Sequence, residues 1–190
     1  MPNWCDTTYK CVGDKKELRA LKKVLDSNFK RKKTRVPNGF GKCWIGNIID
    51  QLGYDWHKYR CRGEITDYSL DGEVLTINQQ TAWCEQEGFR QVIEENFASL
   101  KVYYQEQEPG CEVFATDSFE YFPEHYFLDS YEDWEYFKAI EEVAEHVKTI
   151  VGHEVEADLN AIQKELDAYV EDHDSEDLFY SLHDFTEVSD

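Results

Sequence analysis

The chain of 190 residues is 41% hydrophobic and 15% aromatic, which excludes wholesale disorder and is enough for one domain with a helical appendage. No run of 18 apolar residues and no apolar N-terminal stretch occurs, so we expect no membrane span, no signal peptide and a cytoplasmic protein. A formal net charge of −20 disfavours a polyanionic partner except at a locally basic patch.

The first predicted elements are a strand and a helix. Residues 3–12 alternate in the manner of a strand. One face of this strand holds Cys5, Thr7, Tyr9 and Cys11. Gly13 ends the strand, and Asp14 is a favourable N-cap for a helix that reaches about residue 28. Glu17, three residues after Asp14, predicts a capping box.

An insertion at about 29–58 separates this helix from the next strand. It begins with the basic run FKRKKTR at 29–35 and continues through a turn rich in Pro and Gly. A short helix is predicted over 43–52, because Trp44, Ile48 and Leu52 recur every four residues.

A hairpin and a second helix follow the insertion. The Asp71-Gly72 dipeptide favours a tight turn between strands at 61–70 and 74–80. Beyond the junction that ends at Trp83, which we expect to pack into the core, the spacing of apolar residues predicts an amphipathic helix. Its buried stripe is Phe89, Val92, Ile93 and Phe97. Two more strands are predicted, at 99–106 and 111–117.

This order of elements predicts an α+β fold. Residues 1–118 are expected to form a ferredoxin-like domain, an antiparallel sheet with two helices on one face, carrying the insertion at about 29–58. Residues 119–190 are expected to form an acidic helical appendage and tail. Ser130 caps its first helix, which ends at Gly152, and a second helix begins near Glu154. The tail is either a short docked helix or a mobile acidic segment.

Several short motifs resemble one known family. They are M-P-N-W-C at the N-terminus with Gly13 and the Leu18/Leu21 helix, Thr81-Ala82-Trp83 at the strand-to-helix junction, and Tyr103-Tyr104 with Glu108 and Gly110. In this order they resemble the YubB ferredoxin-like family of plasmids and phages, over roughly residues 1–21 and 59–118. The chain departs from that family at 84–87, where members tend to have Ser and prolines. The resemblance implies a ferredoxin-like fold and a bacterial mobile element, and it implies no enzymatic activity.

Motifs for catalysis and metal binding are absent from the sequence. No nucleophile elbow, zinc-protease motif, Walker A or dinucleotide-binding motif occurs. The six cysteines form no C-x-x-C pair and have no His at ligand spacing, so we expect free thiols, no metal and no cofactor. Cys84 lies near a helix start, but Glu85 and Glu87 oppose its ionisation. We therefore expect no enzyme, unless a cleft holds His57 or Cys84 beside an acid.

The halves of the chain differ in charge. Residues 1–63 hold 15 Lys and Arg against 6 Asp and Glu, whereas residues 64–190 hold 5 against 34. The basic half offers a candidate nucleic-acid contact: Lys30, Arg31, Lys32, Lys33 and Arg35. The open sheet face offers Trp4, Thr8 and Lys10 but lacks the aromatic signature of an RNA-binding sheet. Alternatively, the run is an exposed loop that contacts the acidic half.

The acidic half offers a candidate partner surface. Residues 119–190 hold 22 Asp and Glu and 3 Lys and Arg. Carboxylates spaced along rigid helices can imitate the phosphates of a duplex. The candidate surface is Glu132, Asp133, Glu135, Glu141, Glu142, Glu145, Glu156, Asp158, Glu165 and Asp167. Alternatively, these acids are only the exposed faces of two amphipathic helices.

From these observations we predict a non-enzymatic accessory protein of a bacterial mobile element that acts by binding another protein. In its sharper form the hypothesis is an acidic DNA mimic that inhibits a host defence or nucleic-acid-binding protein. The alternative is a nucleic-acid-binding domain that uses the basic loop at 30–35.

Overall fold

The computed structural model describes residues 3–37, 39–131, 133–173 and 178–189. Met1 and Pro2 of the opening motif, Asn38 of the predicted turn, and Glu132 of the predicted acidic surface lie outside these ranges. The chain forms two compact units, Met1–Ser118 (unit 1) and Phe119–Asp190 (unit 2). Among the described helices, none is both long and apolar enough to cross a membrane.

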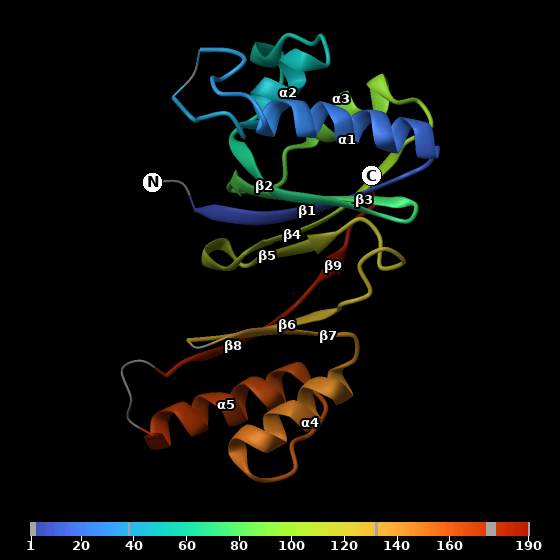
Figure 1. Cartoon of the computed structure of the whole chain (residues 1–190). Coiled ribbons are helices and arrows are strands. Elements are labelled where there is room, and N and C mark those ends of the chain that lie inside the picture. The colour runs from blue at the N-terminus through green and yellow to red at the C-terminus, as the bar shows by residue number, and fades with distance from the viewer. Residues whose placement is uncertain (1–2, 38, 132, 174–177, 190) are drawn as a thin grey trace. The chain divides into compact units, whose positions relative to one another are not determined.

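Unit 1 is a sheet covered by helices. Its strands are β1 (Trp4–Val12), β2 (Gly63–Asp71), β3 (Val74–Ala82), β4 (Lys101–Glu108) and β5 (Val113–Thr116). They run antiparallel in the order β2-β3-β1-β4-β5. Its helices are α1 (Lys15–Phe29), α2 (Ile45–Gln51) and α3 (Glu87–Asn96), with the short 3-10 helices η1 (Trp56–Lys58) and η2 (Pro109–Cys111). Figure 1 shows α1, α2 and α3 on one face of the sheet.

The alternation in β1 decides what this sheet buries. Cys5, Tyr9 and Cys11 are fully buried, and Tyr9 lies between Ile77 of β3 and Tyr104 of β4. Because successive strand residues point to opposite faces, the intervening residues of β1 are exposed or half-buried. The predicted inward face of this strand is confirmed.

The turn from β1 to α1 confirms one predicted cap and corrects another. The Asp14 carboxylate accepts a hydrogen bond from the backbone N–H of Lys16, 2.7 Å away, as an N-cap does. The Glu17 carboxylate does not close a capping box, because it accepts from the backbone N–H and the hydroxyl of Ser99. Gly13 is needed here: its φ is +147°, and an added Cβ would lie 2.2 Å from the Ser99 carbonyl oxygen.

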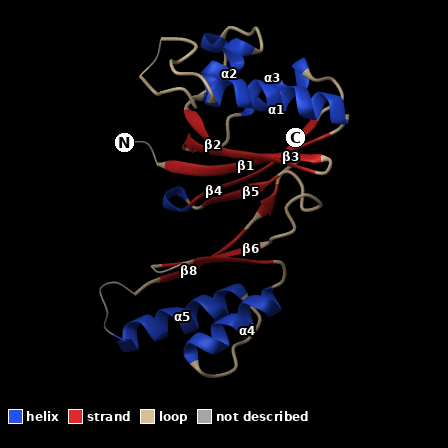
Figure 2. Ribbon diagram, in the orientation of Figure 1, coloured by secondary structure: helices blue, strands red, loops and turns tan. Residues whose placement is uncertain are grey.

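Unit 2 is a second small α+β layer. Its strands are β6 (Tyr126–Ser130), β7 (Trp134–Phe137), β8 (Tyr180–Asp184) and β9 (Thr186–Glu187), and its helices are α4 (Ile140–Val151) and α5 (Leu159–His173). Three strands form an antiparallel sheet in the order β7-β6-β8. Both helices lie on one face of that sheet (Figure 2). The core between them is Leu128, Val143, Val147, Ile162, Leu166 and Leu182.

The predicted fold, a ferredoxin-like sheet with two helices and a helical appendage, is wrong. In unit 1 three helices, α1, α2 and α3, cover the sheet instead of two, whereas β5 is the strand predicted at 111–117. The extra helix, α2, comes from the insertion at 29–58, whose Ile45, Ile48 and Ile49 are fully buried. The insertion is therefore part of the core. The chain is still α+β, with five α-helices and two sheets in its described part.

The predicted helical appendage is wrong because aromatic residues form strands there. Trp134–Phe137 pairs with β6, in keeping with the preference of aromatic side chains for strands. The hydroxyl of Ser130 closes the β6–β7 turn at Asp133 instead of capping a helix. The tail is neither a helix nor a mobile segment at 180–184, where it is β8 and pairs with β6. Gly152, with φ +83°, ends α4 as predicted.

Candidate functional site

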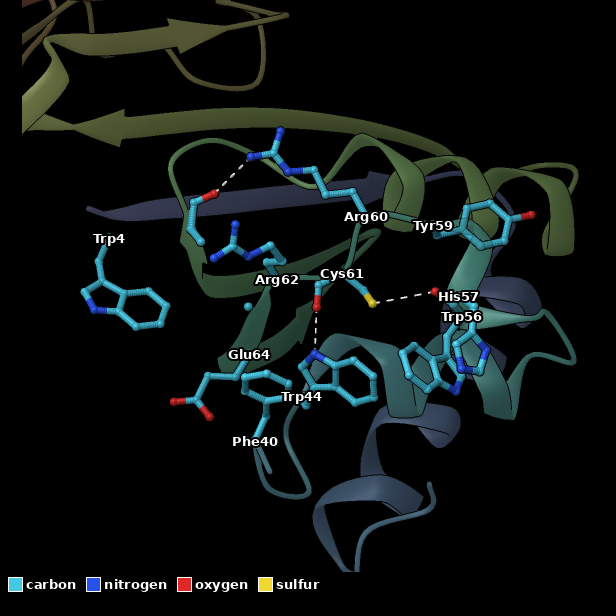
Figure 3. Close-up of a pocket in the computed structure, with 12 residues that line it drawn as sticks. Trp4, Phe40, Trp44, Trp56, His57, Tyr59, Arg60, Cys61, Arg62 and Glu64 are labelled. Atoms are coloured by element: carbon cyan, nitrogen blue, oxygen red, sulfur yellow. Dashed lines mark hydrogen bonds between the residues drawn. The ribbon is translucent and has the colours of Figure 1, made fainter. Parts of the chain in front are cut away.

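A pocket of about 820 Å³ opens in unit 1 at the end of the sheet where β1 and β2 begin and β3 ends. Figure 3 shows the side chains that line it. The lining is Trp4, Phe40, Trp44, Trp56, His57, Tyr59, Arg60, Cys61, Arg62, Gly63, Glu64 and Ala82. Five of these twelve residues are Phe, Trp or Tyr, so much of the lining is aromatic.

Trp44 forms the buried wall of the pocket. Its side chain is 4% exposed, and its indole N–H donates to the Cys61 carbonyl oxygen over 2.6 Å. The ring of Trp56 packs edge-on against it, with centroids 4.9 Å apart. Gly46 makes room for the indole ring of Trp44, because a Cβ added at position 46 would lie 2.3 Å from that ring. The start of α2 thus holds the wall in one position.

Two aromatic side chains at the pocket are largely exposed. Trp4 is 51% exposed and Phe40 is 69% exposed. Phe40 stacks on Trp44, with centroids 5.6 Å apart and an interplanar angle of 29°. Flat apolar faces left in solvent beside a pocket are suited to stacking against a planar ligand.

The charged side chains of the pocket come from one extended segment. Arg60, Arg62 and Glu64 are all exposed and stand at every second position. Gly63 allows this segment to approach β3 closely, since an added Cβ would lie 2.7 Å from the Gln80 carbonyl oxygen. A backbone bridge joins Glu64 to Trp44. The pocket therefore combines aromatic walls with two guanidinium groups and one carboxylate.

The pocket also holds His57 beside an acid, the arrangement that would reopen the question of catalysis. The Nδ1 atom of His57 lies 2.8 Å from Asp55 Oδ1, and its ring stacks on Trp56 with centroids 3.7 Å apart. Asp55 is also the N-cap of η1, where it accepts from the backbone N–H of His57. These hydrogen bonds from His57 lower the pKa of Asp55. A helix cap accounts for the pair without a catalytic role.

The thiols of Cys61 and Cys84 are poor nucleophiles. Burial raises the pKa of Cys61, which lines the pocket. Burial also raises the pKa of Cys84, and this effect outweighs the opposing effect of Arg60. Since the thiolate is the reactive form, both side chains are held in their unreactive protonated state at neutral pH. The geometry favours binding over covalent catalysis.

A buried network of polar groups in unit 1 was not foreseen from the sequence. The Tyr9 hydroxyl donates to Glu85 Oε2 over 2.5 Å, and the Glu85 backbone N–H donates to Glu106 Oε2 over 2.6 Å. Arg90 lies 3.4 Å from Glu85 and 3.6 Å from Asp117. Burial raises the pKa of both Glu85 and Glu106. The signal was present in the strand alternation, which points Glu106 inward with Val102 and Tyr104.

Trp83, expected in the core, is instead 41% exposed. Its φ is +76°, in the left-handed region, and its backbone N–H donates to the Asn3 carbonyl oxygen. This conformation turns the chain from β3 toward α3 while directing the indole away from the core.

The basic run lies on the same connection as one wall of the pocket. Lys30, Arg31, Lys32, Lys33 and Arg35 are all exposed. Lys30 is the C-cap of α1, and Arg35 forms an ion pair with Asp50 of α2. The connection then continues to Phe40 and Trp44.

The predicted acidic surface lies in unit 2, and most of its carboxylates have local partners. Glu135 faces His146, Glu145 pairs with Lys148 and Glu165 with His153. Glu142 and Asp158 accept hydrogen bonds from backbone N–H groups at the starts of α4 and α5. Asp133 accepts from the Trp134 backbone, and Asp167 accepts from Gln163. Glu141 and Glu156 are exposed. The surface is acidic, but capping and ion pairing explain much of it.

No cluster of metal-binding side chains is found in the described ranges. No family model, curated protein or solved structure matches this chain. The resemblance to the YubB family stays a prediction.

Proposed function

We propose that this protein binds single-stranded nucleic acid through the pocket and the basic loop at 30–35. The observation that carries the proposal is the combination, in one unit, of exposed aromatic rings and exposed cations: Trp4 and Phe40 beside Arg60 and Arg62. A base exposes two flat faces and its backbone exposes one negative charge per nucleotide, so both chemistries are needed together.

Stacking of bases on aromatic rings adds affinity that does not depend on charge. Base-to-aromatic stacking contributes about 1–3 kcal/mol per base in such proteins. The rings of a duplex are covered by their neighbours in the stack, so exposed aromatic side chains favour unpaired bases. Trp4 and Phe40 therefore favour a single strand over a duplex.

Near the basic loop at 30–35, the positive charge of the loop matters more for binding than the net negative charge of the chain. Lys30, Arg31, Lys32 and Lys33 are consecutive and exposed, and residues 1–63 carry a net +9. Because charges more than about 8–10 Å apart are largely screened at physiological salt, the charges close to the loop affect a bound strand more than the net charge of the whole chain does. Binding of this kind weakens steeply as salt rises.

The test is fluorescence anisotropy with a labelled ten-nucleotide single strand and the matching duplex, at 50 and 200 mM salt. We expect the full chain to bind the single strand more tightly, and more weakly at the higher salt. Replacing Lys30, Arg31, Lys32 and Lys33 by Ala should flatten the salt dependence, and Phe40→Ala should weaken binding at both concentrations. The double variant K138A/K164A, in unit 2, is the control for loss of positive charge. Absence of binding at 50 mM salt would refute the proposal.

A second candidate function rests on unit 2, which carries 22 acidic residues against 3 basic ones. It is the capture of a basic host protein, with the acidic surface acting as a DNA mimic. Glu141, Glu145 and Glu156 are the acids to change to Gln, because they are exposed and cap no helix. Capture from a host lysate should weaken with salt and with this triple variant; unchanged capture would remove the idea. In both proposals the protein is not an enzyme and acts in the cytoplasm, and it belongs to a bacterial mobile element, the setting that the resemblance implies.

A further inference from the structure

We infer that the pocket prefers guanine among the bases of a single strand, and that Glu64 reads the base. The inference rests on the proposed function and adds the identity of the base. It arises from the single carboxylate in a lining that otherwise offers aromatic rings and cations.

Glu64 stands near an arginine, Arg62, and near an aromatic residue, Trp44. Arg62 and Glu64 stand two residues apart on an extended segment, which places their Cα atoms about 6.7 Å apart on one side of the chain. The backbone bridge between Glu64 and Trp44 holds the backbone of Glu64 next to the residue that forms the aromatic wall. In Figure 3, Arg62 extends toward the side where Trp4 lies, and Glu64 lies beside Phe40 with its carboxylate pointing outward.

Glu64 and Arg62 are available for a ligand. Both side chains are exposed, and the ion pairs found among the described residues do not join one to the other. An ionised carboxylate only accepts hydrogen bonds, and a guanidinium only donates them. The pair therefore offers an acceptor and a donor at neighbouring positions.

Guanine is the base that complements such a pair. Its Watson–Crick edge carries two adjacent donors, the N1–H and the N2 amino group, which one carboxylate can accept together. Its O6 and N7 atoms are the acceptors that Arg binds most often. Adenine, cytosine and thymine lack two donors on adjacent atoms of that edge, so they leave one oxygen of Glu64 without a partner. A volume of about 820 Å³ is ample for a purine.

The probes are labelled DNA pentamers with one variable centre: TTGTT, TTATT, TTTTT and TTITT, in which inosine lacks the N2 amino group of guanine. Anisotropy at 50 mM salt should show TTGTT bound roughly ten-fold more tightly than TTATT, as one bidentate contact gives. TTITT should fall between them. Glu64→Gln should abolish the preference for TTGTT over TTITT, since an amide has one acceptor oxygen and cannot accept from N1–H and N2 with two oxygens as a carboxylate does. Asp67→Asn, on the same strand and outside the pocket, should keep it.

The outcomes separate the inference from the proposed function. If no pentamer or longer single strand binds, the proposed function fails and this inference fails with it. If the four pentamers bind equally, the guanine preference is wrong while the proposed function stands. A preference for TTGTT over TTITT that survives in Glu64→Gln also overturns the role of Glu64.

Discussion

Replacing Tyr9 by Phe isolates the hydrogen bond at the centre of the buried network. Tyr9 is fully buried, and its hydroxyl donates to Glu85 Oε2 over 2.5 Å. Its ring stacks on Phe89 with centroids 6.0 Å apart, a contact that Phe at position 9 retains. The substitution therefore removes one donor from a buried carboxylate and leaves the packing unchanged.

The size of the effect follows from the charge on Glu85. A hydrogen bond to a charged group contributes about 1.5–3 kcal/mol to stability, against about 1 kcal/mol for a neutral pair. We expect the free energy of unfolding of unit 1 to fall by about 2 kcal/mol at pH 8. Because burial raises the pKa of Glu85, this carboxyl is protonated in the folded state at a pH where an ordinary glutamate is ionised. The loss should shrink toward about 1 kcal/mol as the pH is lowered toward the ordinary glutamate pKa of about 4.5.

The assay is urea denaturation at pH 8 and at about pH 4.5, followed by tryptophan fluorescence. Four of the five tryptophans lie in unit 1, at positions 4, 44, 56 and 83, so the signal reports mainly on that unit. Tyr54→Phe is the matched control, since Tyr54 is half-buried and packs edge-on against Tyr59, away from the network. A loss below about 0.5 kcal/mol at pH 8, or an equal loss at both pH values, would refute the reasoning.

Three further predictions follow from other contacts. Burial raises the pKa of Glu106 in the folded state above its unfolded value, so the folded state binds this proton more tightly and stability falls as the pH rises from about 4.5 through the raised pKa. Glu106→Gln should therefore show a weaker loss of stability than the unchanged chain between pH 4.5 and 7 in urea denaturation; an identical slope would argue against burial as the cause. Gly46→Ala should displace Trp44, lower the free energy of unfolding by about 1–3 kcal/mol and weaken single-strand binding, whereas Gly39→Ala, where an added Cβ meets nothing within 4 Å, should change neither. Phe40→Ala should leave the free energy of unfolding within about 0.5 kcal/mol of its original value, because the ring is 69% exposed, and a larger loss would make Phe40 a core residue.

The sequence alone determined most of the elements of unit 1. The alternation at 3–12, the Asp14 cap, the Asp71-Gly72 turn and the stripe of Phe89, Val92 and Ile93 each depend on residues close together in the chain. The spacing of apolar residues does not decide the secondary structure where the same residues fit both a helix and a strand. Trp134 and Phe137 fit both a helical stripe and a strand, and the pairing of β7 with β6, which involves residues 126–129, decides for the strand.

The sequence also showed which charges the chain carries, and it singled out the basic run and the acidic surface. Only the tertiary structure brought Trp4, Phe40, Trp44, Trp56 and Glu64 around one pocket, because they lie on separate segments that the sheet and α2 bring together. The same holds for Tyr9, Glu85 and Glu106, which are far apart along the chain and meet inside unit 1. A charge can be counted from composition, but a site depends on long-range pairing, which no local pattern encodes.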